Sequence, residues 1–84
     1  MNDDKTFTEE FKVTGAQLVE MVKKLLHEAN IRRIIIKNEK GESLLEIPVT
    51  VASVGALLLP VIAAVGALAA LIAHCTIVVV RTKE

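Results

Sequence analysis

The sequence divides into a charged first half and an uncharged second half. Between Glu46 and Arg81 no residue carries a fixed charge, and only His74 in that interval can titrate. A stretch of this length that offers water nothing charged must be buried in a core, an interface or lipid. It constrains the fold of this 84-residue chain more than any other feature.

The middle of the uncharged stretch predicts a long apolar helix. Residues 51–73 include eight Ala and five Leu, which favour helix, and the segment is too long for an ordinary strand. Pro60 predicts a kink in this helix or its division into two shorter ones. The β-branched residues of 75–80 then predict a strand.

The first half carries the signals of an amphipathic helix. Thr14 followed by Gln17 is a capping-box pattern, so we expect the helix to begin at Gly15. Apolar residues then recur at helical spacing along one face, which predicts a helix over residues 15–29. Asn30 predicts its end, because asparagine tolerates the left-handed conformation found after many helices.

Three further segments predict strands, at residues 6–13, 31–38 and 43–50. Gly41 lies in a hairpin turn between the last two, and Pro48 places the end of its strand at a sheet edge or a loop. The expected fold class is α+β: a small antiparallel sheet with an amphipathic helix and a long apolar Ala/Gly-rich helix, in the order (β)-α-β-β-α-β. The first strand is bracketed because its alternation is short. We expect one domain over residues 1–84, with 1–6 as a flexible tail.

The composition argues against several classes of partner and compartment. Ten basic and ten acidic residues leave no net charge, and Trp and Tyr are absent, so a nucleic acid partner is not expected. Cys75 is the sole cysteine, which excludes an intrachain disulfide. The polar residues after Met1 do not resemble a signal peptide, so we expect a cytoplasmic protein, with membrane localisation as the alternative.

No motif predicts catalysis, a cofactor or a metal. His74 and Cys75 are adjacent, but neighbouring side chains on a strand point to opposite faces and would not converge on one ion. The sequence also lacks the glycine patterns of phosphate-binding loops. We therefore expect a protein that is not an enzyme, with no cofactor and no small-molecule substrate that the sequence identifies.

The apolar helix needs more cover than a chain of this size can supply, because the strand segments 34–36 and 77–80 also suggest burial on both faces. Self-association through helix 51–73 is the leading hypothesis, which makes a homo-oligomer the expected state. Small residues at helical spacing permit close approach of helices. The candidate interface residues are Gly55, Leu59, Ala63, Gly66, Ala67, Ala70 and Ala73. Two alternatives stay open. The helix could lie in or across a membrane, for which its length suffices, or it could help to hold an apolar ligand or lipid.

Several stretches of the chain also resemble a known family. They include Glu9-Glu-Phe-Lys-Val, Arg32-Arg-Ile-Ile-Ile-Lys-Asn38 and Leu44-Leu-Glu-Ile-Pro48, and later Gly66-Ala-Leu and Cys75-Thr-Ile-Val-Val. Together they resemble the small prokaryotic proteins called domain of unknown function 4342, over nearly the whole chain. The resemblance implies a compact recurring domain and supplies no activity, ligand or catalytic residue.

Overall fold

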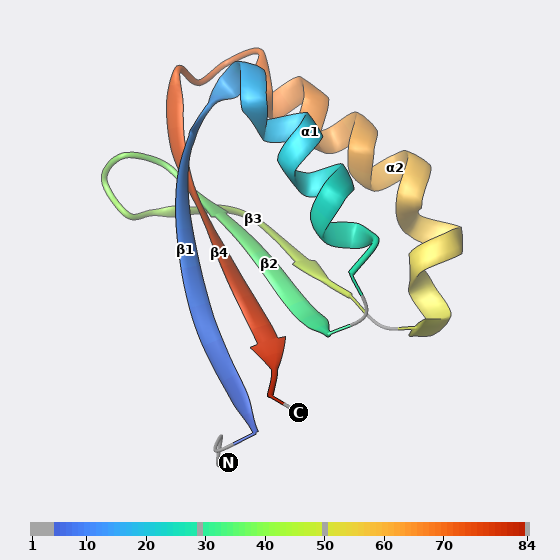
Figure 1. The fold of residues 1–84 in the computed structure, drawn as a ribbon. Helices are drawn as coiled ribbons and strands as arrows, with labels where there is room; N and C mark the ends of the chain where they lie inside the picture. The colour runs from blue at the N-terminus through green and yellow to red at the C-terminus, as the bar shows by residue number, and fades with distance from the viewer. Residues whose placement is uncertain (1–4, 29, 50, 84) are drawn as a thin grey trace.

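The protein has two layers, a four-stranded sheet and a pair of helices that lie side by side on one of its faces (Figure 1). The computed structural model describes residues 5–28, 30–49 and 51–83, and within 51–59 only the backbone. The elements in chain order are β1 (Thr6–Thr14), α1 (Gly15–Leu26), β2 (Ile31–Lys37), β3 (Ser43–Pro48), α2 (Val51–Ala69) and β4 (His74–Thr82). The predicted α+β class, with an antiparallel sheet and two helices, is confirmed.

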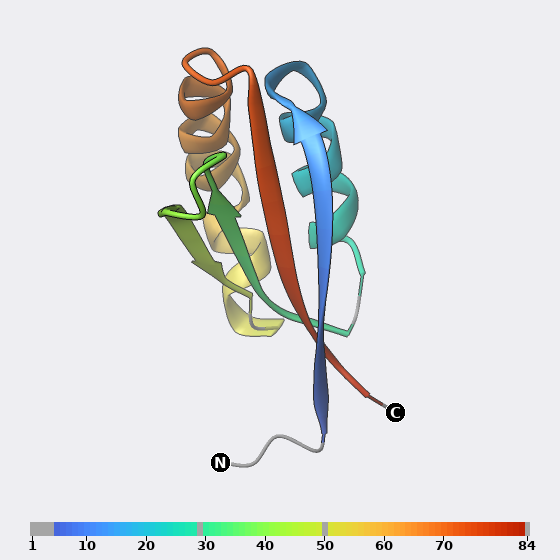
Figure 2. The same ribbon diagram turned by 90° about the vertical axis from the view of Figure 1, so that its left-hand side faces the viewer.

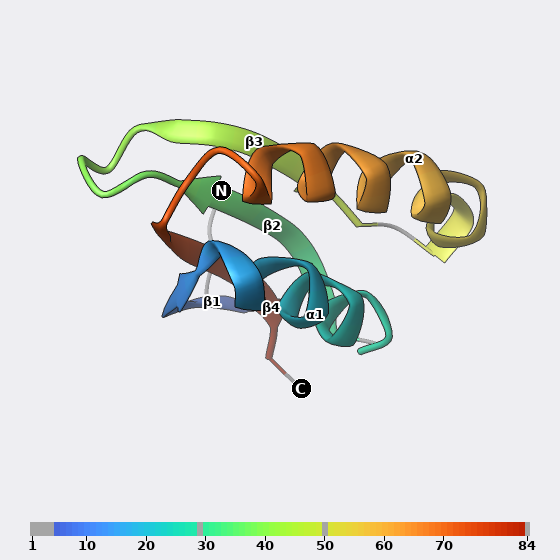
Figure 3. The same ribbon diagram turned by 90° about the horizontal axis from the view of Figure 1, so that it is seen from above.

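The sheet order is β1-β4-β2-β3, and every neighbouring pair is antiparallel. Strands β1 and β2 therefore run in the same direction on either side of β4, and β3 and β4 do so on either side of β2. Each helix connects one of these parallel pairs, and both helices cover the same face of the sheet (Figures 2 and 3). The last strand of the chain thus lies in the middle of the sheet, and β1 and β3 form its two edges.

The core lies between the sheet and the helices. Each of three elements supplies side chains with no exposed surface: Leu18 and Val22 on α1, Ile34 and Ile36 on β2, and Ile77 and Val79 on β4. Strand register aligns the last two pairs, because Ile34 lies opposite Val79 and Ile36 opposite Ile77. The apolar periodicity of α1 and the alternation of β2 therefore point to one interior.

Helix α1 begins where its capping box predicts and ends earlier than expected. The Thr14 hydroxyl accepts from the Gln17 backbone N–H, and the Gln17 side chain accepts from the Thr14 N–H, which confirms the predicted start. The helix ends at Leu26 rather than at residue 29, which lies outside the described residues. The Glu28 N–H donates to the Leu25 carbonyl at 3.1 Å, a three-residue spacing that tightens the last turn toward β2.

The strand predictions agree with the structure to within a few residues. Strand β1 is present from Thr6, so the predicted tail of residues 1–6 overlaps it, while residues 1–4 lie outside the described part. Gly41 has a φ of 86° in the hairpin, where Asn38 Oδ1 accepts from two backbone N–H groups. Strand β3 ends at Pro48 and lies at a sheet edge, as predicted.

Helix α2 differs from the prediction at two points. It continues through Pro60, whose side chain is exposed, so the helix is not divided there. It ends at Ala69, four residues before the predicted end at Ala73. The reason is tertiary: His74 pairs with Thr14 as the first residue of β4, so the chain must leave the helix and turn before that point. His74 is accordingly a strand residue.

The sheet face opposite the helices is less buried than the sequence suggested. Ile35 and Val80 on this face are only half-buried, whereas Ile34 and Val79, their neighbours on the helix side, are fully buried. Val78 is 6% exposed because it lies on a central strand, between Glu10 and Ile35. The prediction that both β-branched runs are buried on both faces is therefore wrong for Ile35 and Val80.

Candidate functional site

Helix α2 presents an apolar surface to solvent. Four exposed residues lie on one side of the helix, and an exposed leucine follows in the turn after it: Pro60, Ala63, Ala64, Ala67 and Leu71. The four helical residues follow the i, i+3, i+4, i+7 spacing of one helical face, and Leu71 lies in the turn that follows. Leu71 is 83% exposed. We call these five residues the α2 outer face.

The opposite side of α2 carries the large side chains. Val65 is fully buried in the core, and Val61, Ile62, Leu68 and Ile72 pack against it partly buried. The two sides of the helix thus differ in the size of their side chains and not in polarity, since neither side carries a charge. Alanine on the outer side leaves the backbone accessible to a neighbouring helix.

The predicted interface residues lie only partly on this surface. Ala63 and Ala67 belong to the α2 outer face, and Gly66 is half-buried on its flank. Ala70 and Ala73 are exposed and lie, like Leu71, in the turn that follows the helix. The side chain of Leu59 and the surroundings of Gly55 lie outside the described residues. Pro60, Ala64 and Leu71 are exposed on the same surface and were not among the predicted residues.

His74 and Cys75 lie on opposite faces of β4, as predicted. His74 is exposed, whereas Cys75 is 3% exposed and faces the core, where burial raises the pKa of its thiol. Among the described residues, no three His, Cys, Asp or Glu side chains lie close enough together to hold a metal ion.

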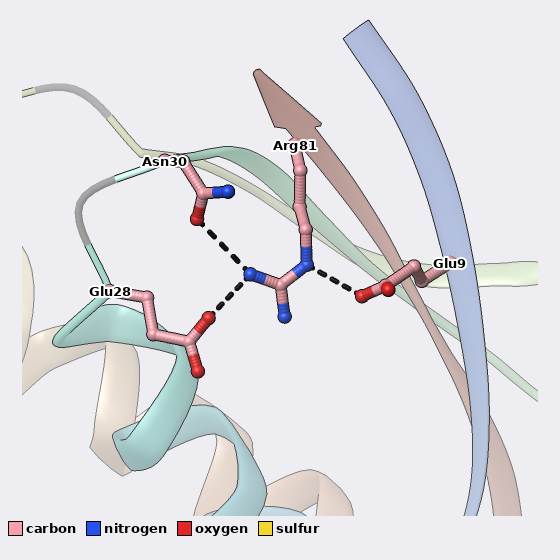
Figure 4. A network of polar contacts seen from close by, with 4 residues as sticks. All are labelled: Glu9, Glu28, Asn30 and Arg81. Atoms are coloured by element: carbon pink, nitrogen blue, oxygen red, sulfur yellow. Dashed lines mark hydrogen bonds and ion pairs between the residues drawn. The ribbon is translucent and has the colours of Figure 1, made fainter. Parts of the chain in front are cut away.

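A polar cluster joins three parts of the chain at the other end of β4 (Figure 4). The Nε–H of Arg81 donates to Glu9 on β1 at 2.5 Å. Its Nη1 donates to two residues between α1 and β2, Glu28 at 2.5 Å and Asn30 at 3.1 Å. The side chain of Arg81 is 14% exposed. The hydrogen bond to Glu28, which has the larger effect, and the one to Glu9 both raise the pKa of Arg81. The sequence placed no partner for Glu9, which lies 72 residues from Arg81.

We expect Arg81→Met to lower the free energy of unfolding by about 2 kcal/mol. The substitution removes charge-assisted hydrogen bonds from a nearly buried group, and the two carboxylates that remain are exposed enough to be rehydrated in part. Urea unfolding followed by circular dichroism measures the change. Arg33→Met is the matched control, because the Arg33–Glu46 pair is about half exposed at both ends and should contribute at most about 0.5 kcal/mol. Equal losses for the two variants would contradict a structural role of the Arg81 cluster.

The arrangement defines a small two-layer α+β protein whose exposed apolar surface lies on its second helix. A family model described as Domain of unknown function (DUF4342) matches residues 4–81, so the chain belongs to this family. No curated protein and no solved structure matches the chain. Within the described residues, no helix has both the length and the apolar character needed to cross a membrane.

Proposed function

We propose that this protein is a non-enzymatic self-assembling module in which the α2 outer face forms a subunit interface. The observation that supports the proposal is that the α2 outer face is entirely apolar and exposed. Its helical residues, Pro60 to Ala67, extend along the helix for about 10 Å, at about 1.5 Å per residue. Exposed apolar residues are ordinary when scattered, but a contiguous patch is typical of a contact surface.

The composition of this face suits a helix partner. Alanines at positions 63 and 67 are four residues apart, which permits two helices to approach closely without large side chains between them. A second copy of the same chain offers the identical surface, and two-fold pairing of identical patches is the commonest way that proteins form oligomers. The half-buried Gly66 on the flank would lie near such a contact.

We expect Ala63→Glu to lower the particle mass measured by size-exclusion chromatography with light scattering. The unsubstituted protein should elute at a defined multiple of 9.1 kDa. A carboxylate at position 63 would be buried without a partner in the interface, at a cost of several kcal/mol, whereas in the free chain it remains in water. Gly66→Arg should act in the same direction, because a Cβ at Gly66 meets no atom within 4 Å and the free chain has room for it.

Ala16→Glu is the matched control, since Ala16 is an exposed alanine on the other helix. It should leave the mass unchanged. An unsubstituted protein that is monomeric, or an Ala63→Glu variant with the mass of the control, would contradict the proposal. The same apolar face could instead rest on a membrane surface. Flotation of the unsubstituted protein with phospholipid vesicles, lost in Ala63→Glu, would support that alternative.

A further inference from the structure

The outer edge of β1 is a second surface whose backbone can accept a partner. Strand β1 is nine residues long and pairs with β4 on one side, and within the described residues no strand lies beyond it. An edge strand of this kind presents a row of N–H and C=O groups that can pair with another strand.

The two edges of the sheet differ in how they are protected. Strand β3 has six residues, ends at Pro48, and its pairing with β2 contains a register shift between Ile36 and Lys37. Proline, shortness and irregularity each hinder the addition of a strand. Strand β1 has none of these features, because its register with β4 runs without a shift from Thr6 opposite Thr82 to Thr14 opposite His74. Only the β1 edge is a regular template.

We propose that two copies of the chain pair through this edge, β1 against β1 in antiparallel orientation, with Phe11 of each copy opposite Phe11 of the other. A two-fold axis perpendicular to the sheet relates the copies, so opposed side chains lie on the same face and the helices of both copies lie on the same side. The result is a continuous eight-stranded sheet. Because β3 is protected, the pairing closes at two copies.

Charge selects this register. With Phe11 at the centre, Glu10 lies opposite the partner's Lys12, and the symmetry axis repeats the pair. Both side chains are exposed on the face opposite the helices, where Glu10 is aligned with Val78 and Lys12 with Thr76. Opposite charges directly across an antiparallel pair stabilise it, and like charges destabilise it.

The neighbouring registers place like charges together. Centring the pair on Glu9, Glu10 or Lys12 brings that residue opposite its own copy, which repels. In this two-fold arrangement the axis must pass beside a residue that lies opposite its own copy, because opposed side chains must be on the same face of the sheet. The possible registers therefore differ only in which residue of β1 is at the centre. The Phe11 register is therefore the one near the middle of β1 that opposes unlike charges and no like ones.

Apolar contacts on the helix side of β1 would stabilise the proposed β1–β1 pairing in addition to its backbone hydrogen bonds. Phe11 packs against the core but remains partly exposed at the edge, so a partner ring beside it would cover it. A groove lies beside this edge, and its lining is mostly polar: Lys12 and Val13 from β1, and Gln17, Glu20, Met21, Lys23, Lys24 and His27 from α1 and its C-cap. An added strand would lie along this groove and cover the half-buried Met21.

The inference does not depend on the α2 interface, and the experiment separates the two. All variants are made in the Ala63→Glu background, which removes the proposed α2 contact, and mass is measured by light scattering and sedimentation. Lys12→Glu and Glu10→Lys each convert both cross-strand pairs to like charges, so each should raise the dimer dissociation constant at least about tenfold. Mixed in equal amounts, the two variants present Glu opposite Lys at both pairs and should recover a dimer.

Lys40→Glu is the control, because it makes the same charge reversal at an exposed hairpin residue and should leave the dimer intact. Lys12 and Glu10 are exposed, so both variants should retain the circular dichroism spectrum of the fold. The register is supported if the dimer is lost in each single variant and recovered when the two variants are mixed. The inference is overturned if Ala63→Glu is monomeric without further change, if the single reversals keep the dimer, or if the mixture stays monomeric. An Ala63→Glu variant with unreduced mass contradicts the α2 proposal instead.

Discussion

Replacing Gly15 by alanine is expected to lower the free energy of unfolding by about 3 kcal/mol or more, although the change adds a single methyl group. A Cβ at this position would lie 2.2 Å from the Ile72 carbonyl oxygen and 2.7 Å from that of Ala69. Both are backbone atoms, one in the last residue of α2 and one in the turn after it, so no side-chain rotation can relieve the contact. Helix α1 would have to move away from α2.

The cost arises because Gly15 joins the start of α1 to the turn that follows α2. Its N–H donates to the Ala73 carbonyl at 3.0 Å. The first N–H groups of a helix have no partner within the helix, and here the Ala73 carbonyl, in the turn between α2 and β4, supplies one. Displacing α1 would break this bond as well as relieve the steric contact.

Gly66→Ala is the matched control for this prediction. Gly66 also lies in a helix, but a Cβ there meets no atom within 4 Å. Alanine at Gly66 should therefore raise the free energy of unfolding by about 0.5 to 1 kcal/mol, since it reduces the backbone freedom of the unfolded chain. Urea unfolding distinguishes the two. A Gly15→Ala variant as stable as Gly66→Ala would contradict the close packing of the two helices.

The features that the sequence predicted correctly are those encoded by neighbouring residues. The capping box of Thr14 and Gln17 and the Asn38–Gly41 turn each depend on side chains that contact backbone within four residues. Such contacts form wherever the segment is placed in the fold, so local patterns are sufficient to find them.

The features that the sequence missed depend on distant contacts. Residues 70–73 have good helix propensity, but the pairing of His74 with Thr14 requires the chain to turn there. The Arg81 cluster joins residues more than 50 positions apart. A clue was present, since Glu9 alternates with the apolar Phe7, Phe11 and Val13 on one face of β1, and a charge on such a face needs a partner. Choosing Arg81 as that partner required knowing that β1 lies beside β4.

The sequence could not predict which side of the second helix is exposed, for a related reason. The absence of charge in residues 51–73 identified the helix but gave no polarity with which to orient it. Only the size of the side chains separates its two sides, with Val65 inward and Ala63, Ala64 and Ala67 outward. Composition alone therefore predicted that the helix is apolar, while the direction of its exposed face came from the sheet and helix that it packs against.

Replacing Ile36 by alanine is expected to lower the free energy of unfolding by about 4 kcal/mol. Ile36 has no exposed surface and lies opposite Ile77 in the core between the sheet and the helices. Removing most of a buried isoleucine side chain loses its transfer free energy and leaves a cavity that the surrounding side chains fill only in part. Because small domains unfold with about 5 to 15 kcal/mol, this loss should be evident as a shift of the urea midpoint at unchanged slope.

The neighbouring residue Ile35 provides the control, since it has the same side chain on the same strand but points to the other face of the sheet. Ile35 is half-buried beside Val78, so Ile35→Ala should cost only about 1 kcal/mol if this face is open to water. A cost equal to that of Ile36→Ala would mean that a second molecule covers the face. In that case the cost for Ile35→Ala should fall as the protein is diluted, because association contributes to stability by mass action. A cost that is small and independent of concentration would show that this face of the sheet is open to water and is not an interface.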